Sequence, residues 1–395
     1  MPFTSFGEPE LTYLGEVIES QEVWRGTAGN FVARFEDAFA EYTGREYVHA
    51  ICSGTSANEA ALAGVGVGPG DEVICPPCSF IAASMAAIGL GAVPVFADVD
   101  PRTLIITAED IQKAITPKAK AVVVVHLWGQ PAEMDPILAV CRKHNLALVE
   151  DCAQAYGPTY RGRMVGTFGD AACYSLQQSK HITSGEGGIV TADDPEVYKR
   201  AVLYANCGMP WYRHDIEWDK PEPVGGFPTR GHFAFGHNYR MTELQGAVAL
   251  AQLGKIEEFN ARRREVVAAF EAELQGVKGV GLAHRYPDTE PNYWAYPLRA
   301  VAMSAAELAR LVQERKGVGL GRYQEVNYLE ACYQEMNTAR RTSVGVPLPD
   351  YVRYDSGTCP KAEEGGLHLI PIWTHHTVEP ESARNTGRAI REALV

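Results

Sequence analysis

The residues best suited to covalent chemistry lie around Lys180. An apolar run at residues 171–176 precedes this lysine, and a glycine-rich turn at 185–188 follows it before a second apolar run. The pattern predicts two buried strands with Lys180 on the loop between them. A lysine held by rigid neighbours and shielded from water has a lowered pKa, which suits it to Schiff-base chemistry with a carbonyl group. Most lysines are solvated surface charges, so this interpretation depends on the flanking strands.

Small and hydroxyl residues at 52–59 lie between a predicted strand and a predicted helix. Such residues let the backbone approach an anion, hydroxyls donate to it, and the helix start presents unpaired N–H groups. The same residues also describe an ordinary turn with an N-cap, so a phosphate site is indicated only together with the neighbouring motifs. Phe80 follows the next strand, where it is either a core residue or an aromatic face for a flat cofactor ring.

Two acids, Glu150 and Asp151, lie at the end of the fifth predicted strand along the chain. Two buried carboxylates at one strand end cannot both lack a partner. A protonated pyridine nitrogen would serve one of them as a cationic partner. An exposed position at the strand terminus is the alternative for either acid.

These residues sit on a regular alternation of elements. Strand-like runs are predicted at 48–52, 72–75, 93–96, 121–126 and 146–150, and helices at 56–66, 79–90, 107–115 and 133–145. Runs that are apolar on both faces, such as 122–125, favour an α/β fold with a mostly parallel sheet covered by helices on both sides. Ligands of such a sheet gather at the carboxyl ends of its strands. The informative loops all follow strands.

The rest of the chain predicts helices at 10–20 and 30–42, a long loop at 207–237, and one helix over 242–275. A loop of that length indicates a functional or interface role. The arginine run 262–264 is interpreted as a solvated helix face. We place a domain boundary near 255, with a large domain at 1–255 and a small C-terminal α+β domain at 256–395.

Composition restricts the function further. The formal net charge is −13 over 395 residues, which argues against nucleic acid or an anionic membrane as the main partner. Nine cysteines, scattered mostly through apolar runs, indicate a reducing cytoplasm. No signal peptide and no run long enough to span a bilayer is visible. Cys75 and Cys78 have the spacing of a metal or redox pair but no second pair, so we expect no metal.

Together these motifs resemble the DegT/DnrJ/EryC1/StrS family of pyridoxal-phosphate-dependent sugar aminotransferases, which have the aspartate-aminotransferase fold (fold type I). The resemblance covers nearly the whole chain, and its motifs occur in the family's order. They are Ser53-Gly54-Thr55-Ser56, residues 77–82, Glu150-Asp151-Cys152-Ala153-Gln154-Ala155, residues 175–188 and Asn238-Tyr239-Arg240-Met241-Thr242-Glu243.

The resemblance implies a role for each matching residue. Lys180 binds the cofactor as a Schiff base, Asp151 pairs with the pyridine nitrogen, Phe80 stacks on the ring and Gln154 lies near the phenolic oxygen. The phosphate is held by Gly54, Thr55, Ser175 and Gln177, and by Asn238 from the other subunit of a homodimer with shared active sites. The cofactor passes through its pyridoxamine form while the amino group moves from an amino acid to a ketone.

Within the family, the residue at position 177 restricts the class of acceptor substrate. Many members that aminate nucleotide-linked keto sugars have histidine there, whereas residues 177–180 look like the subgroup that aminates scyllo-inosose with L-glutamine in aminocyclitol antibiotic pathways. The 207–237 loop and the tail 369–376 depart from that subgroup. His375 and His376 in this tail are candidates for substrate hydroxyls, with a structural role as the alternative.

Three alternatives remain. A nucleotide-diphospho-keto sugar as acceptor needs basic partners, for which Arg213, Arg230 and Arg322 are the candidates. A synthase of the aminohydroxybenzoate type shares the length and the cofactor lysine. A cofactor-binding regulator without catalysis is the non-enzyme alternative, although retention of Lys180 and Asp151 argues against it.

Overall fold

The computed structural model describes residues 4–25, 30–214, 216–217, 221–321 and 325–395. Within them, a central sheet has seven strands in the order β1-β9-β8-β5-β4-β2-β3. All run parallel except β9, which is antiparallel to both neighbours. Their bounds are β1 Tyr47–Ile51, β2 Glu72–Cys75, β3 Val93–Phe96, β4 Ala119–Val125, β5 Ala147–Asp151, β8 Ala171–Ser175 and β9 Gly188–Ala192. The predicted mostly parallel α/β sheet is confirmed.

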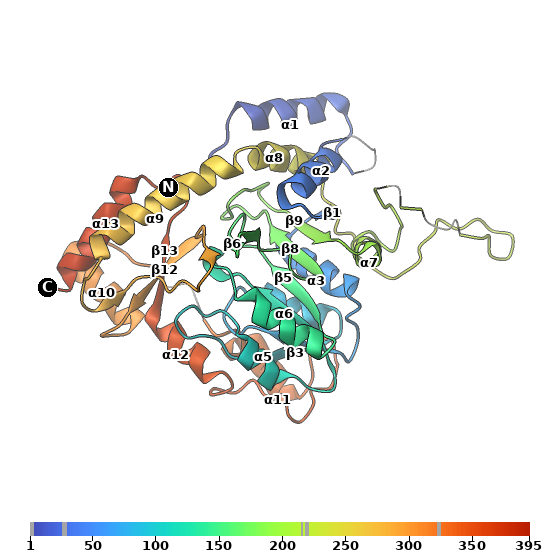
Figure 1. Ribbon diagram of the computed structural model, residues 1–395. Helices are drawn as coiled ribbons and strands as arrows, with labels where there is room; N and C mark the ends of the chain where they lie inside the picture. Colours follow the sequence, from blue (N-terminus) through green and yellow to red (C-terminus); the bar gives the residue numbers. More distant parts are fainter. Residues whose placement is uncertain (1–3, 26–29, 215, 218–220, 322–324) are drawn as a thin grey trace.

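Helices surround this sheet, which occupies the middle of the molecule (Figure 1). Helix α3 packs against α4, α7, β8 and β9, while α5 packs on α6, which contacts β5. Helices α1 and α2 lie against α8 near the β1 end of the sheet. Their bounds are α1 Glu8–Ser20, α2 Phe31–Thr43, α3 Gly54–Gly64, α4 Ala82–Gly89, α5 Ala108–Ala114, α6 Met134–Lys143, α7 Pro195–Ala205 and α8 Glu243–Leu253.

A second core lies around a small antiparallel sheet, β10-β12-β13 (Val280–Gly281, Ala295–Ala300 and Leu369–Trp373). Helices α9 (Ile256–Leu274), α10 (Ala305–Lys316) and α13 (Pro380–Ala393) pack on it. The single helix expected over 242–275 is two helices, α8 and α9, separated at Gly254 and Lys255. The proposed domain boundary falls at this break.

Residues 326–368 return to the large sheet. This segment holds a short 3₁₀ turn (Asn327–Leu329), α11 (Ala331–Ala339) and α12 (Pro360–His368). The ring of Phe96 at the end of β3 meets the rings of Tyr328, Tyr333 and Tyr354. The segment therefore covers the β3 edge, which would otherwise leave backbone groups unpaired.

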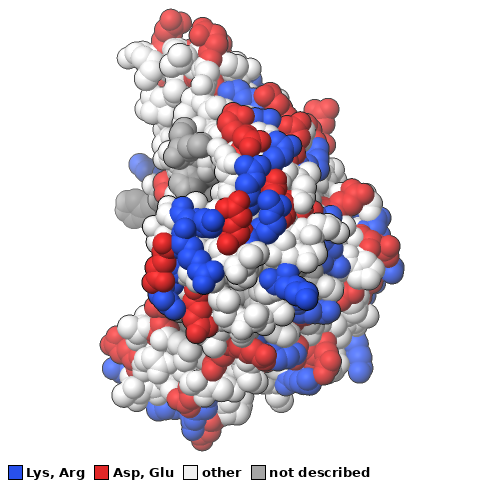
Figure 2. All heavy atoms as spheres, turned by 90° about the vertical axis from the view of Figure 1, so that its left-hand side faces the viewer, with Lys and Arg blue, Asp and Glu red and all other residues white. Residues whose placement is uncertain are grey.

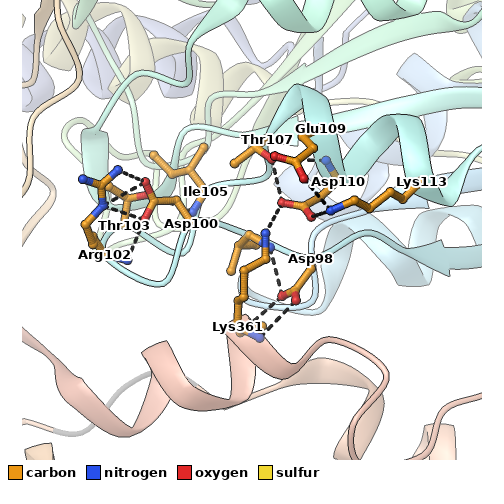
Figure 3. A network of polar contacts seen from close by, with 12 residues as sticks. Asp98, Asp100, Arg102, Thr103, Ile105, Thr107, Glu109, Asp110, Lys113 and Lys361 are labelled. Carbon is orange, nitrogen blue, oxygen red and sulfur yellow. Dashed lines mark hydrogen bonds and ion pairs between the residues drawn. The ribbon is translucent and has the colours of Figure 1, made fainter.

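The start of α12 is fixed by ionic contacts to the same edge (Figure 3). Asp98 accepts hydrogen bonds from the backbone N–H groups of Lys361 (3.0 Å) and Ala362 (2.9 Å). The Lys361 ammonium binds Asp110 of α5 at 2.5 Å. A carboxylate at a helix N-terminus is stabilising because it pairs with N–H groups that have no partner within the helix.

The division into domains at 1–255 and 256–395 stays a prediction.

The remaining strands are short. β6 (Thr159–Tyr160), β7 (Arg163–Met164) and β11 (Thr289–Glu290) form a third small sheet. A 3₁₀ turn at Leu127–Gly129 follows β4. The described residues between α7 and α8 extend away from the body of the molecule (Figure 1). Among the described residues, no helix combines the length and apolarity needed to cross a membrane.

The prediction of a solvated arginine run at 262–264 is wrong for its middle member. Arg263 is fully buried in α9 and donates to the main-chain oxygen of Trp294 at 3.3 Å. Successive helix residues face different directions, so three consecutive arginines cannot share one exposed face. Arg262 pairs with Glu265 and Glu379 on the outer surface. On the face shown in Figure 2, acidic and basic side chains are interspersed.

Candidate active site

A cavity of about 390 Å³ opens at the carboxyl ends of the parallel strands. Residues that directly follow or end β1, β2, β4, β5 and β8 line it. Among them are Gly54, Phe80, Asp151, Gln154, Ser175, Gln177 and Lys180. Chain segments more than a hundred residues apart meet here because parallel strands end at one edge of the sheet.

One corner of the cavity is the N-terminus of α3. Ser53 caps this helix by accepting a hydrogen bond from the Ser56 N–H at 3.1 Å. A Cβ atom at Gly54 would lie 2.6 Å from the Cβ of Ser175, so only glycine fits between the helix start and β8. The first N–H groups of a helix have no intrahelical acceptor and favour an anion. Gly54, Thr55 and Ser175 therefore form a corner suited to a phosphate group.

Two glutamine side chains are oriented by their carbonyl ends. Gln177 Oε1 accepts hydrogen bonds from Ser179 N (2.8 Å) and Ser179 Oγ (2.7 Å). Gln154 Oε1 accepts one from Trp128 N at 2.7 Å. Because an amide has one acceptor and one donor end, each residue keeps its NH₂ group available to donate. Both line the cavity, so both can donate to oxygen atoms of a ligand there.

Lys180 lies on the turn between β8 and β9 and is 9% exposed. Burial lowers the pKa of Lys180 to about 8, although the charges of Asp151 and Glu186 act in the opposite direction. Its Nζ atom lies 4.6 Å from the centre of the Trp294 ring. The Trp294 indole N–H donates to Ser179 O at 2.5 Å. A lysine with this pKa is partly neutral near pH 7.5 and can act as a nucleophile or a base.

Asp151 faces the cavity, whereas Glu150 faces the protein interior. Asp151 accepts hydrogen bonds from Ala153 N (2.9 Å) and from Asn58 Nδ2 (3.1 Å). Burial raises the pKa of Asp151 despite these donors and the charge of Lys180. A carboxylate in this position is well suited to pair with a cationic group of a ligand.

Glu150 uses its oxygens within the protein. It accepts hydrogen bonds from the N–H groups of Gly166, Phe168 and Gly169 at 2.6–2.7 Å and from His126 Nε2 at 2.9 Å. His126 Nδ1 accepts from Ala132 N, so the ring is the neutral tautomer that donates through Nε2. His126, Glu150 and Cys152 lie close enough to share a metal ion. The His126 nitrogens and the Glu150 oxygens are already engaged in these hydrogen bonds, which gives both residues a structural role.

Phe80 lies at the mouth of the cavity with 60% of its surface exposed. Asn238 is also exposed and does not line the cavity of its own protomer. Its contact with a cofactor in a second subunit stays a prediction.

The candidate substrate arginines that the structure describes, Arg213 and Arg230, do not line the cavity of one protomer. Arg213 is held by Glu36 (2.8 Å) and by both oxygens of Asp37. Arg230 is exposed on the segment that extends from the body, and Arg322 lies outside the described residues. The roles of all three arginines stay predictions.

The two histidines of the tail are buried next to α9. His376 stacks on Phe259 with ring centres 3.7 Å apart. Burial lowers the pKa of His376 to about 3 and that of His375 to about 4, with Arg263 adding to both shifts. Neither lines the cavity, which favours the structural role left open for them.

Asn58, Trp294 and Glu186 also belong to this site, although their roles were not predicted from the sequence. Asn58 is one helical turn after Gly54, and Glu186 belongs to the glycine-rich turn, so spacing from a motif gave a signal for both. Trp294 has no such signal, since it lies 115 residues from the Ser179 carbonyl that it contacts. Trp294 is buried in the core of the large sheet, where its backbone N–H donates to Trp128 O at 2.8 Å, and only such tertiary contacts bring it there.

The chain is similar to known aminotransferases in both sequence and structure. Residues 5–346 match the model of the DegT/DnrJ/EryC1/StrS aminotransferase family. A GDP-perosamine synthase of Caulobacter vibrioides is 41% identical over 73% of this chain and 74% of its own. An L-glutamine:2-deoxy-scyllo-inosose aminotransferase of Micromonospora echinospora is 35% identical over 88% of this chain and 81% of its own. A solved aminotransferase of Psychrobacter cryohalolentis superposes with a TM-score of 0.84 at 31% identity, covering 99% and 97% of the two chains.

Proposed function

The chain belongs to the DegT/DnrJ/EryC1/StrS family of pyridoxal-phosphate-dependent aminotransferases, and on this premise we propose that it aminates the ketone of a polyhydroxylated ring. The amino group comes from L-glutamine or L-glutamate, which leaves as its 2-oxo acid. The observation that carries the proposal is the meeting of Lys180, Asp151 and the α3 N-terminus in one cavity.

The residues present fit pyridoxal phosphate. The α3 corner at Gly54, Thr55 and Ser175 suits its phosphate, with Gln177 as a further donor. Asp151 suits the ring nitrogen, Phe80 a ring face, and the Gln154 amide the phenolic oxygen. When bound, the cofactor supplies an electron-accepting ring that stabilises the carbanion formed by removing a proton next to the amino group.

The protein's own groups then perform two tasks. Lys180, with its pKa lowered to about 8, takes and returns the proton at the reacting carbon. Asp151 keeps a negative charge beside the ring nitrogen, which favours the protonated ring. The exposed Phe80 and Asn238 support a homodimer in which a second copy completes each site.

For the acceptor we propose a keto-cyclitol. Lys180 is the cation among the described residues that line the cavity of one protomer, and Asp151 and Glu186 are acids there. A nucleotide diphosphate would need additional arginine or lysine partners, and Arg213 is already paired with Glu36 and Asp37. An uncharged polyol ketone requires no such partners. The similarity to the inosose aminotransferase supports this class, in which the product serves aminocyclitol biosynthesis.

A nucleotide-linked keto sugar is the second candidate. The relative with 41% identity acts in GDP-perosamine synthesis, and its match covers about three quarters of both chains. Basic residues of a partner copy, such as Arg230, would then have to supply the diphosphate contacts. The two candidates thus differ in whether one protomer suffices to bind the acceptor.

A half-reaction screen tests the proposal. The holoenzyme is first treated with L-glutamine or L-glutamate, and loss of its visible absorption reports amino transfer to the cofactor. Keto-cyclitols and nucleotide-linked keto sugars are then added separately. We expect a keto-cyclitol to restore the absorption. Restoration by nucleotide-linked sugars alone would establish the second candidate, and a spectrum that ignores every amino acid would contradict transamination.

A further inference from the structure

A buried amide on α3 contacts the carboxylate that we assign to the cofactor's ring nitrogen. Asn58 is 1% exposed and lines the cavity. Its Nδ2 group donates to Gly54 O at 3.2 Å and to Asp151 Oδ2 at 3.1 Å. Both hydrogens of the amide are thus used. The flipped amide would place its oxygen against two acceptors, so this orientation is fixed by chemistry.

We propose that Asn58 is a positioning residue that holds Asp151 ionised and directed at the ring nitrogen, and thereby controls how strongly that nitrogen is protonated. The inference rests on the proposed function. Asn58 touches no reacting atom in this role, because it acts through Asp151.

The surroundings of Asp151 explain why one hydrogen bond matters. Among the described residues, Ala153 N donates to Oδ1 and Asn58 Nδ2 donates to Oδ2. Without Asn58, Oδ2 would have no such donor at the buried end of β5. A buried carboxylate that loses a donor becomes harder to ionise. Its proton affinity would then rise, and the proton between Asp151 and the ring nitrogen would shift toward Asp151.

The anchor of Asn58 supports a positioning role. Its contact with Gly54 O ties the amide to the same helix turn that forms the phosphate corner. The packing of α3 on the sheet is made by other residues, including the fully buried Ala57, Ala60 and Ala61. The helix start, Asn58 and Asp151 therefore form one rigid unit, so the phosphate site and the ring-nitrogen site keep a constant separation.

Two variants separate this role from a merely structural one. Asn58→Leu removes the donor at similar volume. Asn58→Asp keeps the shape but places a second acid beside Asp151, and like charges at this distance cannot both ionise easily. At low pH a protonated Asp side chain at position 58 can donate to Asp151 and restore the contact. We therefore expect Asn58→Asp to regain function as pH falls, and Asn58→Leu to show no such recovery.

The direct readout is the ¹⁵N NMR signal of holoenzyme prepared with ring-¹⁵N-labelled cofactor. We expect a protonated ring nitrogen in the wild type and a shift toward the unprotonated position in Asn58→Leu. The rate of the first half-reaction should fall by roughly ten- to a hundredfold, the range expected for losing one hydrogen bond to a charged group. Glu59→Gln is the matched control, because Glu59 is the next residue of α3 and binds the hydroxyls of Tyr204 and Tyr239 instead.

The outcomes distinguish the inference from its premise. A wild-type ring nitrogen that is unprotonated would contradict the role of Asp151 itself. A protonated wild type with an unchanged signal in Asn58→Leu, at equal cofactor occupancy, would overturn the role of Asn58 and leave that of Asp151 intact. A Glu59→Gln signal that moves as far as that of Asn58→Leu would show a general effect of α3, and would also overturn the inference.

Discussion

Glu150 and Asp151 are neighbours at the end of β5, but their carboxylates lie in two regions with different hydrogen-bonding environments. Glu150 faces a closed region in which three amide N–H groups and His126 satisfy its oxygens. Asp151 faces the cavity, where two hydrogen bonds leave part of its capacity unused. Buried charges that stabilise a fold are fully paired, whereas a charge that serves a ligand must remain available.

The pKa values of the two acids shift in opposite directions. Burial alone would raise the pKa of Glu150, but hydrogen bonds from His126, Gly166 and Gly169 outweigh burial and hold it below its usual value. Burial dominates at Asp151 and raises its pKa. Ionised Glu150 therefore contributes to the stability of the fold, whereas ionisation of Asp151 lowers stability but provides a charge that can serve a ligand.

Among substitutions of residues that line the cavity, Lys180→Ala should have the largest effect. We expect the visible absorption of covalently bound cofactor to disappear and the half-reaction rate to fall by about 10⁴-fold or more, because both the covalent link and the proton-transfer group are lost. Stopped-flow absorbance with L-glutamine measures both effects. Turnover retained in this variant would mean that a different lysine carries the cofactor.

Asp151→Ala should reduce the half-reaction rate by about 10³-fold while leaving the cofactor bound, since a neutral ring accepts electrons poorly. Because a costly buried charge is removed, we expect the apoprotein to unfold at the same temperature as the wild type or slightly higher. Cofactor titration and thermal unfolding measure the two effects. A near-normal rate would refute the pairing of Asp151 with the ring nitrogen.

Glu150→Ala should show the reverse pattern. Its removal leaves the N–H groups of Gly166, Phe168 and Gly169 and the His126 ring without their acceptor. We expect a loss of about 3 kcal/mol or more of the free energy of unfolding, by the cost of breaking a buried charged network. Denaturant titration of the apoprotein measures it, and a loss as small as that of a surface substitution would contradict the structural role.

The pH dependence of stability provides a further test of the difference between Glu150 and Asp151. Since the folded-state pKa of Glu150 lies below 4.5, its stabilising contribution is complete above that pH and is lost as pH falls through the folded value. Asp151 has a folded pKa above 3.8, so its ionisation costs stability as pH rises through that folded value. The gain in stability from Asp151→Asn should therefore grow from acid to neutral pH. A gain independent of pH in unfolding midpoints would contradict this assignment.

The smallest effect is expected at Trp294. Trp294→Phe keeps an aromatic ring over Lys180 but loses the hydrogen bond to Ser179 O, so we expect a change of only a few-fold in the half-reaction rate. Trp294→Ala should admit water and move the pKa of Lys180 from about 8 toward 10.5. The pH dependence of covalent cofactor uptake by the apoprotein measures this shift. Trp24→Phe, at an exposed indole, serves as the control.

Local patterns predicted much of the site because its main residues lie directly after strands. Gly54, Phe80, Asp151, Ser175 and Lys180 were found from the alternation of strands and helices and from the resemblance to a family. All of them line the cavity. The strand-to-helix turns carry their own sequence signals, namely small residues, helix caps and glycine turns.

Other features depend on contacts between distant segments. The predicted helix over 242–275 showed continuous periodicity, but it is interrupted at Gly254 and Lys255. After the break, Ile256 and Phe259 still pack in the same core as α8, and α9 enters the second core from Val266 onward. The return of residues 326–368 to the β3 edge depends on aromatic contacts with Phe96 and on the charges around Lys361. Neither feature has a local periodic signal, because each depends on contacts with segments that are distant in the sequence.

The sequence by itself determined the mostly parallel sheet, the edge of it at which the candidate site residues gather, and the residue types of that site. These follow from periodicity and turn chemistry, which are local. The tertiary structure alone decided that Glu150 faces inward while Asp151 faces the cavity, that Asn58 supports Asp151, and that Trp294 covers Lys180. The orientation and solvation of a side chain are set by neighbours far away in the chain, and those neighbours determine its charge state.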